Sequence, residues 1–265
     1  MDGWELVRRA AADGRSGAAE IAERAAEGLS LLATRRDVER AARHLVRAHP
    51  SMAPLWRLGA AALASTDHRT AAARFRDALL AQASEVARAA EWALPRRAIV
   101  LTHSASSNVV AALVRNRKRI VRVLCTVSLP GGEGRALSRR LERAGFAVEV
   151  VPDTAAARAC AEATTVLVGA DAVTEDAAVN KIGTRLLALA AQDAGIGFYV
   201  LAGTSKFLPA RLLLPHPLFE GTPLGLIDAV ITERGPLGTA AVRRQVRRIT
   251  IPRALAPRRS PGATR

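Results

Sequence analysis

The chain has 265 residues, 49% of them hydrophobic and 3% aromatic, and its formal net charge is +15. This composition excludes a disordered chain and predicts a globular protein whose core is built mainly from Ala, Leu and Val. No apolar run approaches the roughly 20 residues that cross a bilayer, and the first residues lack the basic and apolar regions of a signal peptide. Cys125 and Cys160 are not spaced as metal ligands, so we expect a cytoplasmic protein with no membrane partner.

The excess of arginine first suggests a nucleic-acid-binding protein, because basic faces attract phosphate backbones. The arginines are scattered along the chain, however, and aromatic residues that could stack on bases are almost absent. The pattern therefore favours solvated arginine faces over specific nucleic-acid recognition, and a weak, non-specific attraction to polyanions stays open. Residues 256–265 are locally basic and are predicted to form a disordered tail.

The first 95 residues show the spacing of amphipathic helices, in which apolar residues recur every three or four positions. Breaks at Asp13-Gly14 and His49-Pro50 separate consecutive segments. The predicted helices cover residues 4–12, 17–32, 36–48, 53–64 and 70–90. Residues 1–95 are therefore predicted to be a helical N-terminal domain.

After Pro95 the pattern changes to short β-branched runs that alternate with helical stretches. The predicted strands cover residues 98–101, 120–124, 147–151, 165–168, 198–201 and 229–231, and the predicted helices cover 109–114, 135–144, 155–161 and 182–194. This alternation predicts an α/β fold with a Rossmann-like parallel sheet over residues 96–255. Ligands of such sheets bind beyond the carboxyl ends of the strands, so the residues that follow each strand are the candidates for a site.

Two candidates follow the first and the fourth predicted strands. Ser104 and Ser106 lie where a helix begins, so their hydroxyls and the free N–H groups there could bind an anion, although ordinary helix capping is the better explanation of this segment taken alone. Asp171 follows an apolar strand, where partial burial would raise its pKa towards a value suited to proton transfer. A simple turn aspartate is the alternative for Asp171.

The lysines give a further signal, because the chain contains only three and otherwise uses arginine. Lys118 lies in a basic run at an expected helix end, whereas Lys181 and Lys206 follow strands and lie near glycine-containing turns. Asn180 and Lys181 precede a predicted helix, where they could hold a phosphate or sugar hydroxyls. Each signal alone also fits a surface or capping residue, but one cleft could collect all of them. The five histidines show no metal-site spacing, so we expect neither a metal nor another cofactor.

These residues resemble the family that contains the alpha, beta and delta subunits of translation initiation factor 2B, ribose-1,5-bisphosphate isomerase and methylthioribose-1-phosphate isomerase. The more specific matches are Gly169-Ala170-Asp171 and Asn180-Lys181-Ile182-Gly183-Thr184. Lys206-Phe207 belongs to the same set of matches, supporting matches are Thr102-His103, Gly134-Arg135 and Thr222-Pro223, and Ser16-Gly17-Ala18 is a looser match near the N-terminus. The resemblance covers nearly the whole chain.

The resemblance implies a helical domain followed by a Rossmann-like domain, and a homodimer or higher homo-oligomer. The family's enzymes convert an aldose 1-phosphate into a ketose 1-phosphate with a cysteine and an aspartate. Transferred residue by residue, Asp171 matches the catalytic aspartate, and Asn180, Lys181 and Lys206 match ligand-contacting positions. The resemblance also places Gly14, Arg15 and Ser16 in a loop that approaches the phosphate, and we add Ser106 to the phosphate-binding residues.

The chain departs from the family's isomerases at several positions. The catalytic cysteine is replaced by Ser104, which is a far weaker acid than a thiol. A family run with a Glu–Arg pair appears here as Val127-Ser128-Leu129-Pro130, and an arginine of the helical domain is replaced by His49. The retained Asp171 favours a sugar-phosphate isomerase that binds a phosphorylated pentose and uses Asp171 with Ser104. The departures favour the alternative, a non-catalytic regulatory protein that senses a sugar phosphate or a nucleotide.

Overall fold

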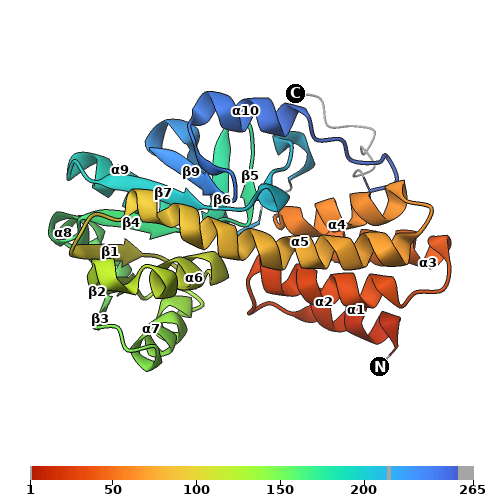
Figure 1. The fold of residues 1–265 in the computed structure, drawn as a ribbon, viewed down its shortest axis with the longest axis horizontal. Helices are drawn as coiled ribbons and strands as arrows, with labels where there is room; N and C mark the ends of the chain where they lie inside the picture. Colours follow the sequence, from red (N-terminus) through yellow and green to blue (C-terminus); the bar gives the residue numbers. More distant parts are fainter. Residues whose placement is uncertain (1, 214–215, 256–265) are drawn as a thin grey trace.

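The computed structural model describes residues 2–213 and 216–255, and the basic tail predicted at 256–265 lies outside the described residues. The chain begins with helices that pack together, as the apolar periodicity predicted (Figure 1). They are α1 (Gly3–Ala12), α2 (Ala18–Ser30), α3 (Arg35–Ala48), α4 (Ala53–Ala64) and α5 (His68–Ala89). In the described part of the chain, no helix is both long enough and apolar enough to cross a membrane.

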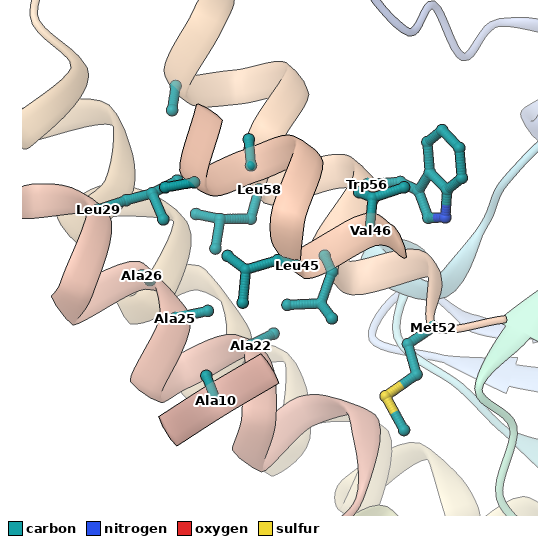
Figure 2. Packing of buried hydrophobic residues seen from close by; sticks show 14 of the residues in the cluster. Ala10, Ala22, Ala25, Ala26, Leu29, Leu45, Val46, Met52, Trp56 and Leu58 are labelled. Atoms are coloured by element: carbon teal, nitrogen blue, oxygen red, sulfur yellow. The ribbon is translucent and has the colours of Figure 1, made fainter. Parts of the chain in front are cut away.

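Small residues allow the first helices to approach closely. A Cβ built on Gly3 would lie 2.7 Å from the carbonyl oxygen of Gly28, so a side chain at Gly3 would separate α1 from α2. Figure 2 shows Ala22 and Ala25 of α2 facing Leu45 of α3 in the same buried cluster. The alanine-rich composition therefore produces a core of closely spaced helices with few aromatic side chains.

A mostly parallel sheet follows the helical part. Its strands are β1 (Ala98–Thr102), β2 (Ile120–Thr126), β3 (Val148–Val151), β4 (Thr165–Val168), β7 (Gly197–Leu201), β9 (Ala229–Thr232) and β10 (Gly235–Leu237). Among the described residues their order is β10-β9-β7-β4-β1-β2-β3, and only β10 runs antiparallel to its neighbour. This arrangement confirms the predicted α/β class, and β10 adds an edge strand where the sequence predicted only a turn.

Helices cover both faces of this sheet because alternate strand residues point to opposite sides. One face packs against the end of α5, α6 (Ser107–Arg115) and α7 (Glu133–Arg143). The other packs against α8 (Ala156–Glu162), α9 (Thr184–Asp193) and α10 (Thr239–Arg247). Figure 1 shows α5 running along both the helical part and the sheet, so the division at residue 95 stays a prediction about domain organisation.

A second, antiparallel sheet of β5 (Ala172–Val173), β6 (Ala177–Lys181) and β8 (Phe219–Pro223) extends from the end of β4. The sequence predicted loops here, because these strands are short and lack β-branched runs. Leu255, the last residue that the structure describes, returns to the helical part, where it is 4% exposed and lies 2.9 Å from where a Cβ on Gly59 would be placed. The helical core thus includes residues from the far end of the chain.

Candidate functional site

The order of the strands places a topological switch point between β1 and β4. The chain leaves β1 towards β2 on one side, whereas β4 lies on the other side, so the loops beyond β1 and β4 diverge and leave a crevice between them. Residues 103–107 follow β1, and residues 169–171 follow β4. The sheet topology therefore directs two of the sequence candidates, Ser104–Ser106 and Asp171, to the same edge.

Ser106 packs directly on the segment that carries Asp171. A Cβ built on Gly169 would lie 2.4 Å from Ser106 Oγ, so only glycine allows this approach. Ser106 is also the N-cap of α6, where its Oγ accepts from the Val109 N–H at 3.4 Å. The first turn of α6 therefore faces the end of β4, and its N–H groups can attract an anion there.

Asp171 is fixed by its own backbone. Its N–H donates to Val179 O at 2.8 Å, and its carbonyl oxygen accepts from Ala53 N at 3.0 Å, at the first residue of α4. The helical part therefore contacts this strand end directly. Burial raises the pKa of the Asp171 carboxyl to about 6, while the positive charges of Lys206 and Lys181 oppose that rise.

Lys206 lies next to Asp171 and is only 6% exposed. Its Nζ donates to the Ala170 carbonyl oxygen at 2.5 Å, which aims the ammonium group at the strand end that carries Asp171. Burial lowers the pKa of the Lys206 ammonium, and the nearby Asp171 carboxylate counteracts this shift. The pair is a desolvated acid and base whose protonation states depend on each other.

Lys181 is 3% exposed and forms an ion pair with Glu133. Glu133 is the first residue of α7, and its second carboxylate oxygen, Oε2, is buried without a hydrogen-bond partner among the described residues. Glu133 was not among the site residues predicted from the sequence. Its position directly after Gly131-Gly132, at the start of a helix that follows β2, is the signal that could have identified it.

Asn180 and Lys181 lie at the end of β6 rather than in a loop before a helix. The Asn180 amide donates to Thr184 Oγ1 at 3.1 Å. The α9 N-terminus was expected to be open to an anion, but a carboxylate of the chain occupies it. Glu220 Oε1 accepts from the N–H groups of Gly183 at 2.7 Å and Arg185 at 2.9 Å. Glu220 was also missed, because β8 was read as purely structural.

Ser104 adopts a left-handed backbone conformation with φ +61°. Its N–H donates to Ser128 Oγ at 2.7 Å, and Ser128, with φ +64°, belongs to the run that differs from the family's isomerases. Asp153 accepts from the N–H groups of Ser128 and Leu129, which fixes this loop. No hydrogen bond to the Ser104 hydroxyl is formed within the described part of the chain.

His103 connects the loop after β1 with the loop that carries Lys181. Its Nε2 donates to Ile182 O at 2.8 Å, and its Nδ1 accepts from Thr126 Oγ1 at 2.7 Å. Burial lowers the pKa of the imidazole, so His103 is neutral in this arrangement. A Cβ at Gly183 would lie 2.9 Å from the His103 ring, which keeps that turn in close contact.

The loop of Gly14, Arg15 and Ser16 is held by Asp13, which accepts from the N–H groups of Arg15 and Ser16 at 2.9 Å. Burial alone would raise the pKa of the Asp13 carboxyl. The hydrogen bonds from Ser16, Arg15 and Arg24 outweigh this effect and keep the pKa below the ordinary range. Figure 1 places this turn between α1 and α2 at the end of the helical part that faces the sheet. No hydrogen bond or ion pair within residues 2–213 and 216–255 joins it to Asp171.

The structure therefore gathers Ser106, Asp171, Lys181 and Lys206 at one strand edge, whereas Gly14–Ser16 stay tied to their own helices. The gathered groups can exchange a proton at Asp171 and stabilise negative charge through two buried lysines. Within the residues described, no cluster of His, Cys, Asp or Glu side chains has the geometry of a metal site.

Comparison with known proteins agrees with this architecture. A protein of Pyrococcus horikoshii, named translation initiation factor eIF-2B subunit 2-like, is 32% identical over 87% of this chain and 94% of its own length. The ribose 1,5-bisphosphate isomerase of Archaeoglobus fulgidus is 35% identical over 52% of this chain and 53% of its own length. The crystal structure of a translation initiation factor eIF-2B from Pyrococcus horikoshii has a TM-score of 0.80 at 29% identity, and covers 89% of this chain and 96% of that chain.

The same fold occurs in the 5-methylthioribose 1-phosphate isomerase of Pyrococcus horikoshii, with a TM-score of 0.72 at 19% identity over 93% of this chain and 86% of that chain. The family model described as the initiation factor 2 subunit family matches residues 14–213. This match includes α2 to α5 of the helical part and the strand ends that carry Ser106, Asp171, Lys181 and Lys206. The chain therefore belongs to the initiation factor 2 subunit family.

Proposed function

We propose that this protein binds a phosphorylated pentose beside Asp171 and interconverts an aldose 1-phosphate and a ketose 1-phosphate. The observation that carries the proposal is Asp171 itself, whose pKa burial raises to about 6 between two lysines. A carboxyl with this pKa can both donate and accept a proton near neutral pH. An unpaired surface aspartate would stay ionised and could not act as the acid.

The reaction needs one group that gives a proton and takes one back. Protonated Asp171 gives its proton to the ring oxygen as the bond between C1 and that oxygen breaks. The hydrogen on C2 then moves to C1, and the C2 hydroxyl returns its proton to Asp171 as the C2 carbonyl forms. All atoms of the sugar are retained, and Asp171 ends in its starting state.

The other groups have separate roles in this proposal. The N–H groups in the first turn of α6, beside Ser106, bind the phosphate, and Lys206 stabilises the charge that develops near Asp171. Glu133 Oε2 is buried and has no partner within the described residues, so it can accept a hydrogen bond from a sugar hydroxyl. The proposal keeps Asn180, Arg15 and the rest of the 14–16 loop as ligand contacts that close on a bound sugar.

NMR of the purified protein with candidate aldose 1-phosphates tests the proposal. We expect a ketose product from the wild type and none from Asp171→Asn, with binding of the sugar phosphate retained. Lys118→Met is the matched control, because Lys118 is exposed and lies away from these strand ends. Product formation by Asp171→Asn at the wild-type rate would rule out Asp171 as the acid.

A non-catalytic regulatory protein is the second candidate, and Ser104 supports it. The family's isomerases carry a cysteine at this position, and the Ser104 hydroxyl has no base within hydrogen-bond reach in the described structure. In that case the wild type would bind the sugar phosphate saturably without turnover. Ser104→Cys distinguishes the two cases, because a gain of activity would show that the remaining machinery is competent.

A further inference from the structure

Helix α3 carries a row of basic side chains on the face opposite its buried face. Arg36, Arg40, Arg43 and Arg47 are exposed and recur at three- and four-residue intervals, and the exposed His44 follows Arg43 directly. Val38, Ala41, Ala42, Leu45 and Val46 are the buried residues of the same helix. At about 1.5 Å per residue the row extends over about 16 Å, along one side of the helical part.

Two of the four arginines in this row have no neighbouring carboxylate among the residues that the structure describes. Arg43 pairs with Glu39 at 2.8 Å, whereas Arg40 lies 4.0 Å from Asp37. Arg36 and Arg47 have no carboxylate within ion-pair distance in the described chain. An exposed row of this kind is by itself an ordinary solvated face. A surface hollow beside the row adds an aromatic side chain to these basic groups.

The surface hollow lies between α1 and α3 and is lined by Trp4, Arg8, Arg40 and His44. The guanidinium carbon of Arg40 lies 5.5 Å from the centre of the Trp4 ring. Arg8 has no ion-pair partner among the residues that the structure describes. The hollow therefore combines an aromatic ring with two guanidinium groups and an imidazole.

We propose that the α1–α3 face, defined by Trp4, Arg8, Arg36, Arg40, His44 and Arg47, binds single-stranded nucleic acid. Arginines recognise the phosphate backbone, and an unstacked base can stack on an indole ring or a guanidinium plane. The bases of a duplex are already paired and stacked, so they cannot stack on Trp4. An acidic peptide would pair with the arginines but would make no use of the Trp4 ring. The row gives affinity without reading sequence, in agreement with the scattered arginines of the chain.

Fluorescence anisotropy of a short labelled oligoadenylate with the full-length chain tests this proposal. The triple variant Arg36→Gln/Arg40→Gln/Arg47→Gln should bind roughly tenfold more weakly. It should also reduce the slope of log affinity against log salt by about 2, because each lost phosphate contact removes about 0.7 on a single strand. The matched control, Arg139→Gln/Arg140→Gln/Arg143→Gln on α7, removes the same charge from exposed positions and should stay within about twofold of the wild type.

Trp4→Leu tests the stacking separately and should weaken binding roughly fivefold without changing the salt slope. Quenching of tryptophan fluorescence in the wild type on binding, and its loss in Trp4→Leu, gives a second readout of contact with the Trp4 ring. Equal losses in the two triple variants would overturn the proposal in favour of net charge alone. Equal affinity for the matching duplex, or displacement of the oligonucleotide by polyglutamate at equal charge, would overturn it too. The varied residues lie on α1 and α3 and take no part in the site around Asp171, so the result does not depend on the function proposed for Asp171.

Discussion

Charged residues are used differently in the helical part and at the carboxyl edge of the sheet. In the helical part most ion pairs are exposed and join residues three or four positions apart, such as Arg9–Glu5 and Arg88–Glu85, whose members are between 41% and 62% exposed. At the sheet edge they are buried and contact residues far along the chain. Lys181, at 3% exposure, pairs with Glu133, and Lys206, at 6%, reaches the strand end of Asp171.

The difference shows that buried charges, unlike exposed ones, require specific partners in the fold. Both members of an exposed pair stay largely hydrated, so pairing adds little to the free energy of unfolding. Other residues can therefore replace them. A buried charge must find a specific partner, because an unpaired one costs several kcal/mol. The carboxylates of Asp153, Glu220 and Glu133 accept from backbone N–H groups or from Lys181 at this edge. The protein therefore orders its candidate site with internal ion pairs and caps.

The largest effect that tests this contrast is expected at Gly134. A Cβ built there would lie 1.7 Å from the Thr126 carbonyl oxygen, so Gly134→Ala must move either α7 or the end of β2. We expect a loss of at least about 3 kcal/mol in the free energy of unfolding, measured by urea denaturation. Gly225→Ala is the control, since nothing lies within 4 Å of its added Cβ. Equal stability of the two variants would show that the sheet edge is less tightly constrained than we describe.

Lys206→Met is expected to have the next largest effect. The change leaves Asp171 buried without its closest cation, so its pKa should rise above about 6, and stability should fall by about 3 kcal/mol at pH 8. Because the folded-state pKa lies above the ordinary value of 3.8, the contribution of Asp171 to stability is full below that value and declines as pH rises towards 6 and beyond. The loss in Lys206→Met should therefore shrink at pH 4.

Urea denaturation at the two pH values and ¹³C NMR of the Asp171 carboxyl provide the measurements. Lys118→Met supplies the control on an exposed lysine, with an expected change below about 0.5 kcal/mol. A loss in Lys206→Met that is the same at pH 4 and pH 8 would mean that Lys206 and Asp171 are not electrostatically coupled.

The sequence predicted the main architecture because its signals are local. Apolar periodicity located α1 to α5, and alternating β-branched runs located β1, β2, β3, β4, β7 and β9. The antiparallel sheet of β5, β6 and β8 was missed, because strands of two to five residues with polar ends give no such periodicity. Asn180 and Lys181 were consequently expected in a loop.

The partners of the candidate residues could not be predicted for a related reason. Scarcity of lysine drew attention to Lys181 and Lys206, and Asp171 followed from its place after an apolar strand. Glu133 is 48 residues from Lys181, however, and Glu220 is 37 residues from Gly183. Pairings over such separations depend on the three-dimensional arrangement of strand ends, which one sequence does not specify.

The helical part has a specific long-range contact of its own at Leu255. This side chain is 4% exposed in the helical core and lies 2.9 Å from where a Cβ on Gly59 would be placed. Leu255→Ala should therefore lower stability by about 2 kcal/mol or more, measured by thermal unfolding. Leu80→Ala, at a 53% exposed position of α5, should change it by less than about 0.5 kcal/mol. Similar losses in both variants would contradict the docking of the C-terminal segment on α3 and α4.

The smallest effect is expected for the exposed ion pairs of the helices, and it is the most direct test of the comparison. Arg88 donates to Glu85 Oε2 at 2.6 and 2.8 Å, a geometry as good as that of many buried pairs. Arg88→Gln should nevertheless change the free energy of unfolding by less than about 0.5 kcal/mol, because both partners remain hydrated. Urea denaturation at low and high salt measures this, and Glu133→Gln, which leaves Lys181 buried without its carboxylate, is the matched comparison. If Arg88→Gln cost as much as Glu133→Gln, geometry rather than burial would determine the strength of these pairs, and the distinction between the two regions would be wrong.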